Sequence, residues 1–375
     1  MAWYLAVLIM LTFAGLPTAF KHNSTSSTNT FVCYYMATSF FPATQVPADL
    51  CTHIIYSYGI VSPNGIQPIS SADLQNYKTL VQLKKNNPNL KVLLSLQPGF
   101  ESVVSAGSDV MKKFAKLAVS FLSNYGFDGI DLDWEFPKSK DKENFKLFIQ
   151  VLSYNPVILY AETRPVKMLM SAALPNSISA LGGYDVPTFA SAMDFMTAMT
   201  YDFHLFIKNI DNTTGYNSPL FTPKGEPKLF SMSAVLSYYL NVGFPSNKLL
   251  MGISTYGRSW TLTDAAKHDL HAPAKDKGLP GPYRHLRGVY VYPDVCVALQ
   301  QGAKSVIDDT NGAAYLYNDT TWVAYDEKAT ILKKLAWMKS QSLGGVGVWA
   351  MHLDDNTGVC KLGSFPLLNA IKSNL

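Results

Sequence analysis

Short apolar runs recur along the chain at intervals of a few tens of residues. They occupy residues 31–35, 53–61, 91–97, 129–136, 167–174, 195–203, 249–257 and 345–353. Several are too continuously apolar for a strand with a solvent-facing side, so they indicate a parallel sheet covered on both faces. The intervening stretches 110–126, 143–153 and 329–341 have apolar residues at helical spacing. Eight strands alternating with helices predict an α/β fold, a (β/α)8 TIM barrel. A doubly wound open sheet is the alternative.

One interval breaks this alternation. Residues 258–326 are rich in Pro, Gly and Tyr and contain short β-like pieces. A structureless loop of that length is uncommon inside a compact domain, so the interval predicts a small α+β insertion between the seventh and eighth strands. The barrel would then comprise residues 31–257 and 327–375.

The N-terminus has the pattern of a targeting segment. Residues 1–20 are apolar and lack charged side chains, which predicts a signal peptide, with an uncleaved anchor as the alternative. Residues 21–30 are polar and low in complexity, as in a disordered linker. We therefore expect a secreted, extracellular protein with no membrane segment after cleavage.

The net charge and the cysteines indicate which partners and which covalent or metal sites to expect. The net charge is +4 without a Lys/Arg run, so nothing indicates a nucleic-acid partner. Four cysteines in a secretory chain suggest two disulfides, for which the sequence allows three pairings, and their spacing does not fit a zinc site. The sequons at Asn23, Asn212 and Asn318 are candidate glycosylation sites.

The run GFDGIDLDWEFP, residues 126–137, places acids at alternate positions of an apolar stretch. In a strand Asp131, Asp133 and Glu135 would share one face, toward the C-terminal end where barrel enzymes hold their sites. Crowded carboxylates raise at least one pKa, which suits Glu135 to general-acid work with Asp133 beside it. A solvated edge strand or a calcium loop would also use spaced acids, but the bulky residues between them favour a buried strand.

This run resembles the D-G-x-D-x-D-W-E-Y-P signature of the animal chitinases and chitinase-like proteins of glycoside hydrolase family 18. The resemblance extends from residue 31 to the end of the chain. It also includes CTHIIYSY, MTYDFH, STYGRSW, PGPY and VWAMHLDD. It implies a (β/α)8 barrel with an α+β insertion before the last strand, and disulfides Cys33–Cys51 and Cys296–Cys360.

The resemblance also implies a mechanism and a set of roles. Glu135 would protonate the glycosidic oxygen of chitin or a chitooligosaccharide, while the N-acetyl group of the sugar attacks its own anomeric carbon. Asp133 would orient that acetamide, Asp131 would hold Asp133, and Tyr201 would bind the acetamide oxygen. The matching pocket positions are Tyr34, Met199, Asp202, Tyr256, Arg258 and Trp349.

The sequence departs from the family pattern along the substrate groove. Gln97, Pro98 and Gly99 stand where the family usually reads G-G-W, with Phe100 as a candidate substitute. Thr38 replaces an aromatic residue, and residues 205–207 read LFI instead of G-x-W. Losing aromatic contacts worth ~0.5–1.5 kcal/mol each should weaken binding of long chains.

Two functions of different class remain. The intact acids favour a retaining chitinase, weak or limited to short substrates, whereas the altered groove favours a chitinase-like lectin that binds sugar without hydrolysis. No metal-ligand cluster and no phosphate-binding loop occurs in the sequence, so we expect activity without metal or cofactor. We expect a monomer.

Overall fold

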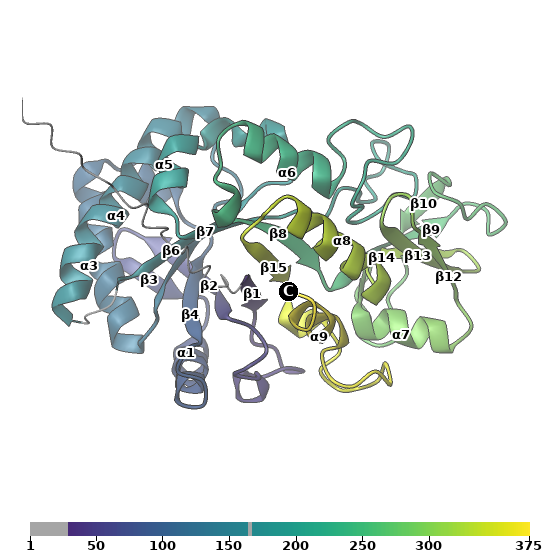
Figure 1. Ribbon diagram of the computed structural model, residues 1–375, viewed down its shortest axis with the longest axis horizontal. Coiled ribbons are helices and arrows are strands. Elements are labelled where there is room, and N and C mark those ends of the chain that lie inside the picture. Colours follow the sequence, from purple (N-terminus) through teal and green to yellow (C-terminus); the bar gives the residue numbers. More distant parts are fainter. Residues whose placement is uncertain (1–28, 164–166) are drawn as a thin grey trace, which may run out of the picture.

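The computed structural model describes residues 29–163 and 167–375, and within them the chain forms a closed parallel barrel (Figure 1). The barrel strands are β1 (Thr30–Tyr35), β2 (His53–Ser62), β4 (Lys91–Leu96), β5 (Gly129–Leu132), β6 (Leu169–Leu174), β7 (Phe195–Ala198), β8 (Leu249–Ser254) and β15 (Gly345–Trp349). Strand β1 pairs in parallel with both β2 and β15, which closes the sheet. The (β/α)8 prediction is therefore confirmed, and the open-sheet alternative is wrong.

Helices follow the strands and cover the barrel. They are α1 (Asp73–Gln82), α2 (Glu101–Val104), α3 (Ser108–Tyr125), α4 (Lys142–Thr163), α5 (Val186–Ala192), α6 (Met232–Asn241), α8 (Lys328–Ser340) and α9 (Pro366–Lys372). The three predicted helices correspond to α3, α4 and α8. In α3, Phe114, Ala118 and Leu122 are buried at the expected spacing, and Gly126 ends the helix in the left-handed conformation at φ 85°. A short strand, β3 (Gly65–Pro68), extends the sheet as a hairpin partner of β2.

Several predicted strands were too long at their C-terminal ends. The runs 129–136, 195–203 and 345–353 stop pairing at Leu132, Ala198 and Trp349. Beyond those points the backbone bends into loops at the C-terminal face, although bulky apolar residues continue to occur there. This correction places Asp133 and Glu135 just past a strand, where their side chains reach the mouth of the barrel.

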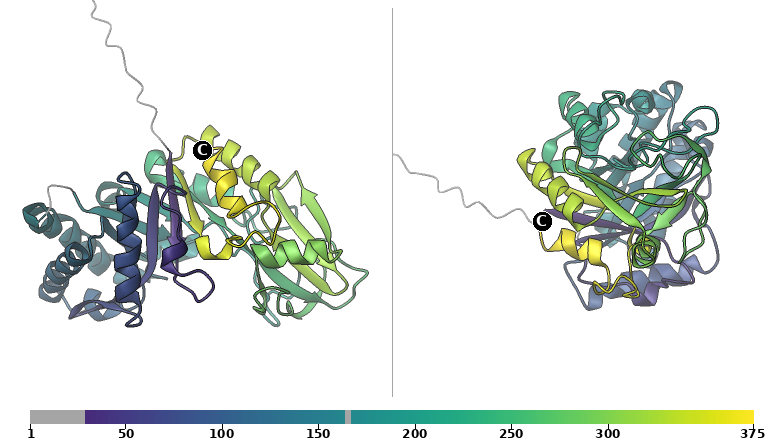
Figure 2. Two further views of the ribbon diagram at one scale, coloured as in Figure 1. Left: turned by 90° about the horizontal axis from the view of Figure 1, so that it is seen from below. Right: turned by 90° about the vertical axis from the view of Figure 1, so that its right-hand side faces the viewer.

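A second sheet lies beside the barrel, at the right in Figure 1 and projecting from it in Figure 2. It is antiparallel and contains β9 (Tyr256–Leu262), β10 (Ala274–Lys277), β11 (Val289–Val291), β12 (Lys304–Asp308), β13 (Ala313–Asn318) and β14 (Thr321–Tyr325), with helix α7 (Tyr292–Gln300). Its own core packs Trp260 edge-on against Trp322, with ring centroids 5.4 Å apart. The predicted α+β insertion is present, and its first strand starts directly after β8.

Two disulfides join distant parts of the chain. Cys33 in β1 is bonded to Cys51 at the entry of β2, and Cys296 in α7 is bonded to Cys360 beyond β15. Both are the pairs that the family resemblance implied. The predicted signal peptide 1–20, most of the linker 21–30 and the sequon at Asn23 lie outside the described residues. Within residues 29–163 and 167–375, every helix is too short or too polar to cross a membrane.

Candidate active site

A pocket of about 440 Å³ opens at the C-terminal ends of the barrel strands. Nine of the ten predicted site residues line it, namely Tyr34, Asp133, Glu135, Met199, Tyr201, Asp202, Tyr256, Arg258 and Trp349. The tenth, Asp131, lies one step deeper in β5 and is fully buried. Side chains from strands far apart in sequence therefore converge on one cavity, as the barrel geometry requires.

Asp131 is anchored inside the barrel by hydroxyl groups from the two neighbouring strands. Ser171 donates to its Oδ1 at 2.6 Å and Ser95 donates to its Oδ2 at 2.8 Å. Burial raises the pKa of Asp131 to about 6, although these hydrogen bonds favour the charged form. The carboxyl is thus fixed in position, and its charged form is less stable than that of an exposed aspartate.

Asp133 and Glu135 form a coupled pair above Asp131. Asp133 is 3% exposed, and burial together with the charges of Glu135 and Asp131 raises its pKa well above the usual value. Glu135 reaches solvent through the pocket, and its partial burial raises its pKa as well. Two carboxyl groups this close do not ionise independently, so the pair retains a proton at a pH where isolated acids are charged.

Another wall of the pocket is built on Asp202. Arg258 donates to both of its carboxylate oxygens at 2.6 Å, and the Tyr256 hydroxyl donates to Oδ1 at 2.7 Å. The backbone of Asp202 is in the left-handed region, at φ 60°, and its N–H donates to the side chain of Asn217. The Asn176 side chain donates to the Tyr201 carbonyl at 2.7 Å. These contacts fix the direction of the Asp202 side chain.

Aromatic rings form the floor of the pocket. Trp349, at the end of β15, lies with its ring centroid 5.9 Å from that of Tyr58 in a stacked arrangement, and 5.7 Å from that of Tyr34. A hydrogen bond from the Tyr58 side chain also favours the charged form of Asp133. Sequence reasoning missed Tyr58, which lies inside β2, where the pairing of β2 with β4 ends.

Comparison with known proteins identifies the family. A model of the glycosyl hydrolases family 18 matches residues 30–354. The chain belongs to glycosyl hydrolase family 18. Mouse chitotriosidase-1 is 34% identical over 355 residues, which cover 90% of this chain and 75% of that protein. Human chitinase-3-like protein 2 is 30% identical over 347 residues, which cover 89% of this chain and 88% of that protein.

Solved structures of family 18 have the same fold. Human YKL-39, described as a pseudo-chitinase with retained chitooligosaccharide binding, superposes with a TM-score of 0.87 at 29% identity. An immunomodulatory active chitinase from Trichuris suis gives 0.86 at 31% identity. Each comparison covers 92% of this chain and 99% of the other. The family 18 chain is therefore similar both to an active chitinase and to a protein described as a pseudo-chitinase.

The structure also tests the replacement for the missing tryptophan platform of family 18. Phe100 is 1% exposed and stacks on Trp134, with ring centroids 5.3 Å apart and planes at 3°. It belongs to the core under the loop, so the expectation that it could replace the platform is wrong. Phe136 and Leu205 line the pocket instead, and neither was predicted as a site residue. Both follow a strand end, where loop conformation decides the direction of the side chain.

Metal ligation was not expected. In the part of the chain that the structure describes, three or more His, Cys, Asp or Glu side chains nowhere come together as a metal-binding group.

Proposed function

We propose that this family 18 chain is a chitinase-type hydrolase that cleaves β-1,4-linked N-acetylglucosamine chains with retention of configuration. The observation that carries the proposal is the coupled pair Asp133 and Glu135 above the anchored Asp131, in a pocket floored by Trp349. A general acid requires a carboxyl whose pKa is raised toward the working pH, and burial raises the pKa of both members of this pair.

The proposed mechanism divides the work among the acids. Glu135, which reaches the pocket, protonates the glycosidic oxygen of the leaving group. The acetamide oxygen of the sugar then attacks its own anomeric carbon, as in the substrate-assisted members of this class. Asp133 accepts a hydrogen bond from the acetamide N–H and stabilises the positive charge that develops. Its Oδ1 is buried and has no hydrogen-bond partner among the described residues, so an acceptor is free for this contact.

Asp131 and Tyr201 support that step. Asp131, held by Ser95 and Ser171, keeps the negative charge beneath Asp133 in place. Tyr201 is buried beside the acids, and burial followed by their charges raises its pKa far above the usual range. Its hydroxyl therefore remains protonated and can donate to the acetamide oxygen, which aligns that oxygen for attack.

The test is release of a fluorophore from chitobiose and chitotriose glycosides by the wild-type protein and by Glu135→Gln. The glutamine keeps the shape and removes the acid, so turnover should fall by at least ~10²-fold. Equal turnover by both proteins would refute the role of Glu135. No turnover by the wild type would refute the hydrolase.

A non-hydrolytic lectin is the second candidate. The observation that favours it is the groove wall, where Leu205 lies in the pocket and Phe100 is buried in the core. Binding of chitooligosaccharides without turnover, measured by calorimetry, would select this function. The similarity to YKL-39, described as retaining such binding, gives it further support.

We also propose secretion as a glycosylated monomer. The two disulfides agree with an oxidising compartment, and the sequons at Asn212 and Asn318 lie on exposed residues. A mass measurement before and after glycosidase treatment of the secreted protein tests this directly.

A further inference from the structure

The substrate pocket adjoins two neighbouring pockets among the described residues. Asn176 and Asp202 line both this pocket and one of about 390 Å³, whose walls include Ser177 and Phe230. Leu205 and Arg258 line both this pocket and a smaller one of about 180 Å³. The pocket that includes Phe40 and Thr357 shares no described residue with the substrate pocket. The described residues therefore extend the cleft past Asp202 and Arg258, and not past Trp349.

Three loops meet where the cleft stops. They comprise residues 36–41 after β1, residues 281–285 of the insertion and residues 354–358 after β15, and we call them the loop bridge. The guanidinium of Arg284 lies 4.0 Å from the ring centroid of Phe40, a cation–π contact between insertion and barrel. The Asn356 side chain donates to the Phe40 carbonyl at 3.4 Å, which joins the two barrel loops.

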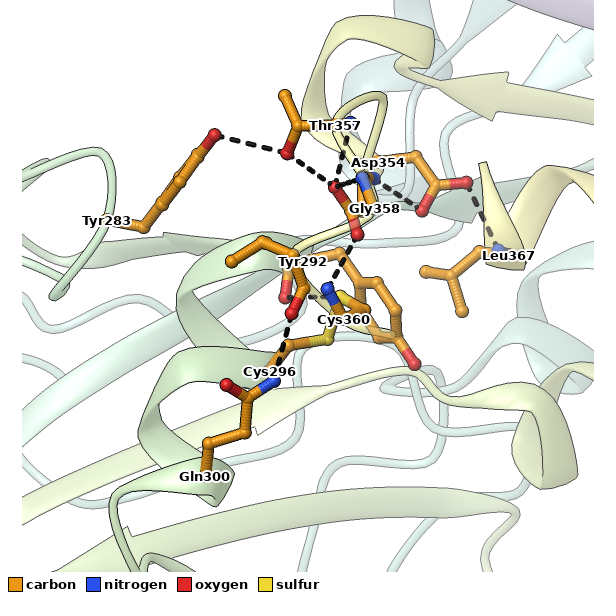
Figure 3. The surroundings of a disulfide bond; sticks show 11 residues. Tyr283, Tyr292, Cys296, Gln300, Asp354, Thr357, Gly358, Cys360 and Leu367 are labelled. Carbon is orange, nitrogen blue, oxygen red and sulfur yellow. Dashed lines mark hydrogen bonds between the residues drawn. A yellow bond between two sulfur atoms is a disulfide. The ribbon is translucent and has the colours of Figure 1, made fainter. Parts of the chain in front are cut away.

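The third side of the loop bridge is covalently supported. The hydroxyls of Tyr283 and Thr357 are 3.2 Å apart (Figure 3), which connects the insertion to the loop after β15. The disulfide Cys296–Cys360 links the same two parts, through Cys296 in α7 of the insertion and Cys360 just beyond the loop after β15. Each of the three loops thus contacts both of the others, so the bridge is a closed ring rather than one movable flap.

Asp355 makes the last of these loops rigid. Its carboxylate is buried and accepts from the Thr357 N–H and hydroxyl, the Gly358 N–H and the Cys360 N–H, at 2.8–3.0 Å. A loop held by so many hydrogen bonds to one charged group does not open easily. The bridge is therefore expected to remain closed when substrate arrives.

We infer that the loop bridge blocks the glycone end of the cleft, so that the protein takes chitooligosaccharides by their non-reducing end. This inference rests on the proposed function, in which Glu135 protonates the leaving group, and it takes Trp349 at the floor of the pocket as the surface under the reacting sugar. On the Trp349 side, His352 lies next, with ring centroids 6.2 Å apart, and its Nδ1 accepts from the N–H of Met36 in the bridge. On the Glu135 side, the cleft is open toward Ser177 and Phe230. Short sugars, or long chains entered from one end, fit this shape.

The test uses chitooligosaccharides attached to a sensor surface through either end, and protein carrying Glu135→Gln so that ligand is not consumed. Sugars attached through the reducing end should bind, because the surface then lies on the open side. Sugars attached through the non-reducing end should not. Replacing Phe40 and Arg284 together by alanine should raise binding in the second orientation by roughly two- to tenfold, about the effect of one recovered stacking contact.

The matched control is Arg287→Ala, which removes the same charge three residues away, where the guanidinium pairs with Asp276 and not with Phe40. It should leave the orientation preference unchanged. Equal binding in both orientations by the Glu135→Gln protein, or an equal gain with Arg287→Ala, would overturn the inference. If the wild type fails to hydrolyse glycosides but the orientation preference persists, only the hydrolase is refuted. Binding in neither orientation would refute the sugar specificity and the inference together.

Discussion

The substitution Asp131→Asn should stabilise the protein at neutral pH while reducing its activity. Asp131 is 0% exposed; its short hydrogen bonds come from the hydroxyls of Ser95 and Ser171, and the Tyr34 hydroxyl donates to Oδ1 at 3.5 Å. Asparagine has nearly the same shape, and its amide can keep both contacts by accepting from one hydroxyl and donating to the other. The substitution therefore removes a buried charge without creating a cavity.

The size of the effect follows from the pKa. Burial raises the pKa of Asp131 from 3.8 to about 6. At ~1.4 kcal/mol per pH unit, the charged carboxylate costs the folded state about 3 kcal/mol relative to the unfolded chain. The folded state binds the Asp131 proton more tightly than the unfolded chain does. The stability that this proton contributes to the wild type is therefore fully present below about pH 4 and is lost as pH rises through about 6. The asparagine side chain of the variant does not titrate, so the variant escapes this loss.

The assay is denaturant unfolding of both proteins across this pH range. Near pH 4 their free energies of unfolding should agree within about 1 kcal/mol, and near pH 7 the variant should be more stable by ~1–3 kcal/mol, because Asp133 shares part of the electrostatic cost. The hydrolysis rate of Asp131→Asn should be lower than that of the wild type, because the negative charge below Asp133 is absent from the variant. A variant that is equally or less stable at neutral pH would refute the assignment of a destabilising buried charge.

Three further predictions concern structure away from the pocket. Lys334→Met should destabilise the fold by ~3–5 kcal/mol, because it leaves the buried carboxylate of Asp326 without its cation. Adding Asp326→Asn should restore most of the lost stability, and the melting temperatures of the single and double variants test this. Although burial opposes it, pairing with two carboxylates raises the pKa of His204 to about 9. The stabilisation that His204 gives the fold should therefore be present below pH ~6.5 and disappear as pH rises through ~9. A difference in free energy of unfolding between the wild type and His204→Gln that stays constant across that range would contradict this. Replacing Cys296 and Cys360 by serine removes a link across 64 residues and should cost about 4 kcal/mol, visible as a lower melting temperature than that of the oxidised wild type.

The barrel could be predicted from the sequence because it is specified by periodic patterns of apolar residues within short segments. Apolar runs buried on both sides, separated by helices such as α3, specify a parallel sheet whichever residues fill the core. The signature around Asp131 was equally informative, since acids on alternate residues between bulky apolar ones have few structural uses. Cys296 and Cys360 could be paired only through the family resemblance, because spacing alone left three pairings open.

Loop directions were decided by tertiary structure alone. Phe100 and Phe136 are both aromatic residues just beyond a strand, yet the first is buried against Trp134 and the second lines the pocket. Neither periodicity nor residue type distinguishes them, because the direction of a loop side chain depends on which neighbours leave room for it.

The closed end of the cleft could not be predicted from the sequence either. Phe40 and Arg284 are 244 positions apart in the sequence, and their contact exists only because the insertion folds back over the first barrel loop. The sequence by itself determined the barrel and the acids at its mouth, through patterns that neighbouring residues impose on one another. The folded chain decided how far a sugar can extend past them, because that depends on contacts between residues with no local relation.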